Sequence, residues 1–223
     1  MGKDSLVLEA IESQKFLPLF YHDDAVTCIE VVRALYAVGV RAIEFTNRGP
    51  AAFENFKALR SAVNGDMPQL LIGIGTIKNT KEAKSFIDAK ADFIVCPVVD
   101  EGIGKLTHAA GLMWVPGCMT PTEINTAHQL DAKLIKVFPG NLVGPSYFTA
   151  LKDIFPGQRL MPSGGVDLTE ENLSGWFGVG AFAVALGSKL ISSALMEAKN
   201  FAQIGENAKK AIELIRSVKT IKA

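Results

Sequence analysis

The segment RAIEFTN, residues 41–47, is a short apolar run with polar side chains at alternate positions. A period of two is typical of a β-strand whose two faces meet different surroundings. Similar segments, rich in β-branched and aromatic residues, recur about every twenty to thirty residues along the chain. The eight segments are FLPLF (16–20), RAIEFTN (41–47), QLLIGIGT (69–76), DFIVCPV (92–98), MWVPGC (113–118), KLIKVF (133–138), RLMPSGG (159–165) and AFAVALG (181–187).

Segments with helical spacing and N-terminal capping residues lie between these runs, at residues 23–39, 79–90, 120–130 and 169–177 among others. Strand and helix repeated eight times without a linker predict an α/β fold, a closed parallel (β/α)₈ TIM barrel, as one domain over residues 1–223. We expect an additional N-terminal helix, around SLVLEAIES, to cap the bottom of the barrel, and the closing segment 188–219 to be helical.

An open doubly wound sheet is the alternative fold. Its dinucleotide-binding form is disfavoured because the first strand-to-helix turn, FYHDDAV, lacks the glycine fingerprint.

Composition fits a globular enzyme, with 48% hydrophobic and 21% charged residues among 223. Lys plus Arg and Asp plus Glu number 23 each, so no net charge favours a nucleic acid or an anionic membrane as partner. Cys28, Cys96 and Cys118 are odd in number, far apart and set in apolar strings, which predicts free buried thiols in a reducing compartment. No basic flank precedes an apolar core at the N-terminus, and we expect a cytoplasmic protein.

Alternation in the second strand segment groups polar side chains on one face. Glu44, Thr46 and Arg48 share that face, whereas Ile43 and Phe45 share the other. The polar face is expected to point into the barrel, where a carboxylate and a guanidinium are costly unless they meet each other or a ligand. A structural ion pair is the alternative to a binding role.

Lys136 interrupts the apolar run KLIKVF and is expected to face inward with Phe138, while Lys133 lies near the strand start. A free lysine has a pKa of about 10.4, so only about one amine in 2,500 is unprotonated at neutral pH. Burial and a nearby cation lower a lysine pKa, and a nearby carboxylate raises it but can carry protons. The neutral amine attacks a ketone to form an iminium ion, which then accepts the electrons of a breaking carbon–carbon bond. The alternatives are a lysine that reaches the rim or one paired with Glu44.

The motifs IEFTNR, GIGT, CP, PGCMTPTEI, LIKVFP, PSGGV and LGSKL occur in this order. Together they resemble the class I 2-keto-3-deoxy-6-phosphogluconate (KDPG) and 4-hydroxy-2-oxoglutarate (KHG) aldolases over about residues 16–190. The resemblance implies a homotrimer that needs no cofactor or metal. The roles that it implies are the Schiff-base lysine at Lys136, the general acid/base at Glu44, pyruvate-carboxylate recognition at Arg48 and Thr76, aromatic packing at Phe138 and a pocket proline at Pro97.

The distal end of the substrate is expected at the ends of the seventh and eighth strands. Phosphate sites in such barrels are built there from backbone amides and helix N-termini, and the candidate residues are Gly164, Gly165, Gly187 and Ser188. The alternatives are that the glycines only make a tight turn and that Ser188 only caps the last helix. Gly73 and Gly75 either admit substrate close to the third strand or serve barrel packing.

The function predicted is cleavage of a 2-keto-3-deoxy-6-phospho sugar acid to pyruvate and glyceraldehyde 3-phosphate, or of KHG to pyruvate and glyoxylate. A phosphosugar epimerase or decarboxylase, and a non-catalytic keto-acid-binding barrel, are the alternatives. A metal-dependent enzyme is disfavoured because His22, His108 and His128 fall on different elements. Departures from the family at Cys96, at Gly140-Asn141 and in GPSYF (144–148) leave substrate preference open.

Overall fold

The structure is a computed structural model that describes residues 2–218. All its strand pairings are parallel, with one sheet in the order β5-β4-β3-β2-β1-β9 and another in the order β6-β7-β8. The eight predicted strand segments all contain strands. Their bounds are β1 Phe16–Phe20, β2 Ala42–Thr46, β3 Leu71–Gly75, β4 Phe93–Val95, β5 Met113–Val115, β6 Gly117–Cys118, β7 Ile135–Val137, β8 Leu160–Pro162 and β9 Val184–Leu186.

Pro116 explains why the fifth predicted segment appears as two strands, β5 and β6. Proline has no backbone N–H to donate to a ladder, and the strand is interrupted at this residue. Its carbonyl still accepts a hydrogen bond from the N–H of Lys136, at 2.9 Å. Residues 113–118 therefore run as one extended segment that contacts β4 on one side and β7 on the other.

The helices follow the strands, as the spacing predicts. Asp24, Asn79, Thr120 and Thr169 cap α2, α4, α6 and α9 by accepting a hydrogen bond from a first-turn backbone N–H. The helices are α1 Lys3–Gln14, α2 Ala25–Ala37, α3 Ala52–Asp66, α4 Thr80–Asp88, α5 Glu101–Ala109, α6 Pro121–Gln129, α7 Gly140–Val143, α8 Pro145–Lys152, α9 Glu170–Gly178, α10 Ser193–Glu197 and α11 Phe201–Ser217.

The expectation of a continuous helix over residues 188–219 is wrong in its first half. Residues 188–190 form a turn, and α10 and α11 are separated at Lys199, whose φ of 53° is incompatible with helix. Asn200 then caps α11 by accepting a hydrogen bond from the N–H of Gln203. Residue 219 lies outside the described residues.

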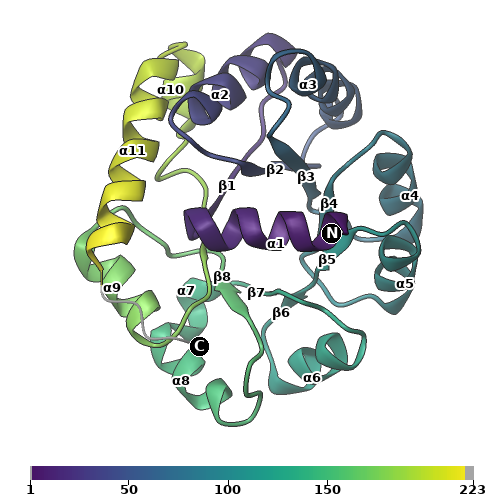
Figure 1. The fold of residues 1–223 in the computed structure, drawn as a ribbon, viewed down its shortest axis with the longest axis vertical. Helices are drawn as coiled ribbons and strands as arrows, with labels where there is room; N and C mark the ends of the chain where they lie inside the picture. Colours follow the sequence, from purple (N-terminus) through teal and green to yellow (C-terminus); the bar gives the residue numbers. More distant parts are fainter. Residues whose placement is uncertain (1, 219–223) are drawn as a thin grey trace.

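The strands separate two apolar layers, one in the interior and one between the strands and the helices. Figure 1 shows the helices arranged around the strands. Ile43 and Phe45 of β2 pack in the outer layer under the helices, as the alternation predicts. The inner layer draws side chains from strands of both sheets and includes Val7 and Ile11 of α1. In Figure 1, α1 crosses the middle of the arrangement of strands. The N-terminal helix therefore covers one end of the strands, as predicted.

β8 and β9 connect the two sheets on the other side. A bridge joins Ser163 to Ala185, and the N–H of Phe182 donates to the carbonyl of Leu160 at 2.9 Å. Because the strands are parallel, the loops that follow them gather at one end of the fold. In the described part of the chain, no helix is both long and apolar enough to cross a bilayer.

Candidate active site

Glu44 is the most unusual polar residue of the interior. Its side chain is 1% exposed, and neither carboxylate oxygen has a hydrogen-bond partner. It lies in the middle of β2, opposite Gly73 of β3. A Cβ at Gly75 would collide with Oε1 of Glu44, and one at Gly73 would collide with the ring of Phe93. Both glycines are thus required by packing, the second of the two interpretations given above.

The charges near Glu44 come from Lys136 and Arg48. Burial raises the pKa of the Glu44 carboxyl, and the positive charges of Lys136 and Arg48 act in the opposite direction. Neither cation is within ion-pairing distance of Glu44. The structural ion pair considered for Glu44 is therefore not formed, and the carboxyl group is left available for a ligand.

Lys136 lies in the middle of β7, between Gly117 of β6 and Met161 of β8. The residue is 5% exposed, and its Nζ lies 5.2 Å from the centre of the Phe138 ring. It therefore neither reaches the rim nor pairs with Glu44. Lys133 is exposed at the start of the strand and pairs with Asp131 at 2.7 Å. The sequence prediction that separates these two lysines is confirmed in its geometry.

Thr76 and Pro97 follow β3 and β4 and are both half-buried. Thr76 has a φ of 64°, which a β-branched residue rarely adopts and which often marks a functional site. Pro97 packs against Gly117, where a Cβ would approach the Pro97 carbonyl carbon to 2.5 Å. Since Gly117 pairs with Lys136, Pro97 lies one strand away from the lysine.

A cavity of about 390 Å³ opens at the carboxyl ends of the strands. Arg48 and Phe138 line it and also interact with Glu44 and Lys136 respectively, so they connect the buried pair to the cavity. Glu44, Lys136, Thr76 and Pro97 do not line it. The structure thus brings six of the ten predicted residues to this wall: Arg48, Phe138, Gly164, Gly165, Gly187 and Ser188.

The glycine pair after β8 has a backbone that other residues rarely adopt. Gly164 and Gly165 have φ values of 93° and 75°. Within the described residues, no hydrogen bond uses the backbone N–H of Gly165 or of Ser188. These donors are free for an anion.

Ser188 caps neither of the last two helices, because Ser192 caps α10 and Asn200 caps α11. The capping alternative for Ser188 is therefore wrong.

Gly140 and Asn141, which depart from the family pattern, pack directly against the glycine pair. The N–H of Gly140 donates to the carbonyl of Ser163 at 2.7 Å, and a Cβ at Gly140 would lie 2.8 Å from the carbonyl oxygen of Gly164. A Cβ at Gly165 would lie 2.6 Å from Cβ of Asn141. These two residues therefore influence the conformation of the loop that contains the candidate phosphate-binding donors.

Four further residues with polar side chains line the cavity and were missed by sequence reasoning: Ser163, Asp167, Asn172 and Lys189. Asp167 and Lys189 stand within two residues of the glycines and the serine of the quoted motifs. A charged residue directly beside a glycine motif, at the carboxyl end of a strand, was the signal that could have found them.

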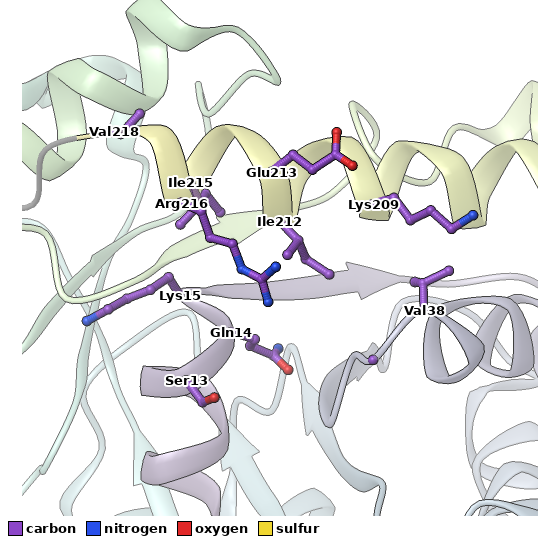
Figure 2. A pocket seen from close by; sticks show the side chains of 11 residues that line it. Ser13, Gln14, Lys15, Val38, Lys209, Ile212, Glu213, Ile215, Arg216 and Val218 are labelled. Carbon is purple, nitrogen blue, oxygen red and sulfur yellow. The ribbon is translucent and has the colours of Figure 1, made fainter.

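A second cavity, of about 500 Å³, lies where α1, the start of β1 and α11 meet (Figure 2). Its wall includes Gln14, Lys15 and Arg216, and none of the ten predicted site residues. Figure 2 shows the guanidinium of Arg216 extending from α11 toward the side of Gln14. Six of the predicted residues line the smaller of these two cavities and none lines the larger one, so the smaller cavity is the candidate site.

Known proteins resemble this chain over most of its length. Residues 7–207 match the family described as KDPG and KHG aldolase. A probable 2-dehydro-3-deoxy-6-phosphogalactonate aldolase of Rhizobium meliloti is 32% identical over 161 residues, 72% of this chain and 74% of the relative. The structure of a 4-hydroxy-2-oxoglutarate aldolase/2-deydro-3-deoxyphosphogluconate aldolase from TTHB1 has a TM-score of 0.80 at 30% identity, covering 93% of this chain and 98% of that one.

A third relative shares the fold at lower identity. The KDPG aldolase of Legionella pneumophila, with pyruvate captured at low pH as a covalent carbinolamine intermediate, has a TM-score of 0.83 at 20% identity. The match covers 92% of this chain and 97% of that one.

Proposed function

The chain belongs to the KDPG and KHG aldolase family, and from this premise we propose that it is a Schiff-base aldolase acting on 2-keto-3-deoxy-6-phospho sugar acids. Such a substrate is cleaved to pyruvate and glyceraldehyde 3-phosphate. KHG, cleaved to pyruvate and glyoxylate, is the second substrate of the proposal. As a family member the protein is a lyase, a pyruvate-dependent aldolase.

One observation supports this chemistry above the others. Lys136 and Glu44 are 5% and 1% exposed, interact electrostatically, and make no ion pair with each other. A buried carboxylic acid without a partner is costly and is expected where a ligand supplies the missing interactions. An amine beside it has a proton donor and acceptor close at hand.

The proposed reaction begins with attack of the Lys136 amine on the C2 ketone of the substrate. A carbon–nitrogen bond forms, water leaves, and the product is an iminium ion. The C3–C4 bond then breaks as the C4 hydroxyl loses its proton. The electron pair of the broken C3–C4 bond flows to the iminium nitrogen, which gives an enamine and a free aldehyde. Protonation of the enamine at C3 and hydrolysis release pyruvate and regenerate the amine.

Glu44 moves the protons of these steps in the proposal, directly or through a water. Its pKa, raised by burial, favours a protonated carboxyl group that donates when water leaves the carbinolamine. The same group accepts a proton when the C4 hydroxyl ionises. Gly75 makes this placement possible, because a side chain there would displace the carboxyl group.

The pyruvate end of the substrate is proposed to contact Arg48 and Thr76. The Arg48 guanidinium makes no ion pair with any described carboxylate and offers a planar fork to the substrate carboxylate. Thr76 adds a directional hydroxyl donor. Phe138 and Pro97 are proposed to pack beside the lysine strand and limit the space for the keto acid.

The phosphate of the sugar acid is proposed to bind at Gly164, Gly165, Gly187 and Ser188. The free backbone donors and the left-handed glycine pair support this assignment. Their place beside Arg48 and Phe138 in one cavity supports it further, because a substrate bound to Lys136 would extend past Phe138 into that cavity.

We further propose that the two parallel sheets form one closed (β/α)₈ barrel and that residues 1–223 make one domain, of which residues 1 and 219–223 lie outside the described part. The inner apolar layer with side chains from both sheets supports closure. The Ser163–Ala185 bridge and the hydrogen bonds to Pro116 and Leu160 support it as well.

A homotrimer and a cytoplasmic location complete the proposal. Family resemblance supports the trimer. Three buried cysteines without disulfides, Cys28, Cys96 and Cys118, support a reducing compartment.

Covalent trapping tests the proposed function. Pyruvate and borohydride together should inactivate the enzyme and add one reduced pyruvyl group to Lys136, as located by peptide mass spectrometry. Lys136→Met should neither trap pyruvate nor cleave substrate. Lys133→Met is the matched control, because it removes a lysine three residues away that is exposed and paired with Asp131.

Labelling at Lys133, or no adduct in folded parent enzyme, would contradict the mechanism. An epimerase or decarboxylase forms no iminium with pyruvate, so the same experiment separates those activities from an aldolase. A barrel that only binds keto acids would trap pyruvate without releasing an aldehyde from KDPG or KHG.

A further inference from the structure

Lys189 and Asp167 form an ion pair across the mouth of the candidate phosphate site. The Nζ of Lys189 lies 3.0 Å from Oδ2 of Asp167, and the two side chains are 59% and 40% exposed. Asp167 comes from the loop after β8 and Lys189 from the turn after β9. Both residues line the 390 Å³ cavity together with Gly164, Gly165, Gly187 and Ser188. The pair therefore joins the two loops that supply the proposed phosphate donors.

Asp167 is held in place by α9. Its N–H donates to the side-chain oxygen of Asn172 at 2.9 Å, while the Asn172 amide donates to the carbonyl of Gly165 at 3.1 Å. Oδ1 of Asp167 accepts from the N–H of Leu168 at 2.7 Å. The hydrogen bond from Lys189 also holds the pKa of Asp167 below its ordinary value. Both carboxylate oxygens are thus engaged, and the acid serves as a fixed anchor for the lysine.

Lys189 retains unused donors beside the cavity. An ammonium group has three N–H donors, and Asp167 is its one ion-pair partner among the described residues. Since the backbone donors of the glycine loop carry no full charge, a doubly charged phosphate needs a cation nearby for stronger binding. Arg48 lines the same cavity but is assigned above to the carboxylate at the other end of the substrate.

We propose that Lys189, positioned by Asp167, is a specificity-determining residue that favours substrates with a phosphate at the distal end. The inference rests on the proposed aldolase function and extends its phosphate site from backbone donors to one charged side chain. Lys189 acts on binding of the distal group and does not take part in iminium formation. Asp167 is a positioning residue, since it contacts Lys189 and the loop rather than the reacting atoms.

The test compares kcat/KM for KDPG and for unphosphorylated KHG in the parent, Lys189→Met, Lys189→Arg and Lys133→Met. Lys189→Met should lower kcat/KM for KDPG about tenfold, mostly by raising KM. This is the lower end of the effect expected from losing a hydrogen bond to a charged group, because the site is partly exposed. KHG turnover and the rate of pyruvate trapping should stay within about twofold of the parent. Lys189→Arg should recover most of the KDPG activity, since it restores the charge.

Lys133→Met is the matched control, since it also removes a partly exposed lysine from an ion pair with an aspartate, outside the cavity. It should leave both substrates unaffected. Equal losses for KDPG and KHG in Lys189→Met, with a lower unfolding midpoint, would mean that the pair only supports the loops and would overturn the inference. So would parent-like selectivity in that variant. Failure of the parent to trap pyruvate would instead overturn the aldolase mechanism.

Discussion

Asp92, at the amino ends of the strands, is buried and has partners on both carboxylate oxygens, whereas Glu44, within β2, is buried and has none. Oδ1 of Asp92 pairs with Lys3 at 2.7 Å, and Oδ2 pairs with Arg60 at 2.6 Å. Oδ2 also accepts from the N–H of Ile72 at 2.7 Å. One acid is stabilised by the fold, and the other is left for a ligand to satisfy.

Gln14 follows the same rule as Asp92. Its amide group donates to the carbonyls of Phe16 and Ala42, and its oxygen accepts from the N–H groups of Arg41 and Ala42. This one side chain ties the end of α1 to the starts of β1 and β2. Gln14 and the carboxylate of Asp92 thus stabilise the amino end through hydrogen bonds and ion pairs, as buried polar groups usually do.

A buried carboxyl group without a partner thus marks the candidate site better than the size of a cavity does. The amino-end cavity is about 500 Å³ and the carboxyl-end cavity about 390 Å³. Gln14, which lines the larger one, already has its hydrogen bonds. The smaller one adjoins the unpaired Glu44 through Arg48.

The largest effect is expected from Glu44→Gln. This variant keeps the size of the side chain and removes its ability to exchange protons, so kcat should fall by about 10² to 10⁴. The midpoint of urea unfolding should not fall, because no partner of Glu44 is lost. Steady-state kinetics and urea titration at the same pH measure both quantities. A loss of stability that accounts for the loss of activity would show that Glu44 is structural and would end the contrast with Asp92.

Asp92→Asn is expected to give the opposite pattern. The buried pair with Arg60 is broken, and the free energy of unfolding should fall by about 3 kcal/mol. The kcat/KM per folded molecule should equal that of the parent, since Asp92 lies at the other end of the strands from the cavity. Urea unfolding and activity normalised to the folded fraction provide the readouts. Reduced turnover in fully folded Asp92→Asn would show that the amino end is coupled to the reaction.

A smaller effect is expected in the pH dependence of stability. The pKa of Glu44 is raised by burial above its ordinary value of 4.5, so the folded state holds a proton that the unfolded state has released. The stabilisation that the raised pKa of Glu44 contributes to the folded state is complete below pH 4.5. It is lost as the pH rises through the folded pKa, so the parent becomes less stable over that pH window. Glu44→Gln cannot titrate and should lack this decline. Unfolding midpoints of both proteins from pH 4.5 upward measure the difference, and parallel curves would contradict the assigned burial of a titrating carboxyl.

The strands and the inward residues within them were predictable because they depend on local alternation. Arg48 and Phe138, predicted on the same inward faces, instead lie past the ends of β2 and β7 and are exposed. Glu44 and Lys136 face inward, and Ile43 and Phe45 face the helices, as the period of two requires. The division of the last helical segment was not predictable, since residues 198–200, Ala-Lys-Asn, contain neither glycine nor proline. The turn there depends on the left-handed backbone of Lys199, a conformation that residues other than glycine rarely adopt.

The residues of the candidate site that belong to sequence motifs were predictable. Those that depend on contacts between separate loops were not. Lys136 and the glycine pair stand within recognisable strings. Asp167 and Lys189 are 22 positions apart (189 minus 167), and their contact exists only because β8 and β9 are neighbours. The need for glycine at position 75 was not predictable either, because the sequence does not tell that the Glu44 side chain of the neighbouring strand occupies this space.

The helix α1 has a consequence for the order in which products leave. Val7 and Ile11 pack with the inner apolar layer at the amino end, so ligands approach Lys136 from the carboxyl end. In the proposed reaction the pyruvyl group is bound deepest, and the aldehyde lies between it and the solvent. The aldehyde must therefore depart first and pyruvate last, an ordered mechanism. Pyruvate then competes with the sugar acid for the free enzyme, whereas the aldehyde acts as a noncompetitive product inhibitor.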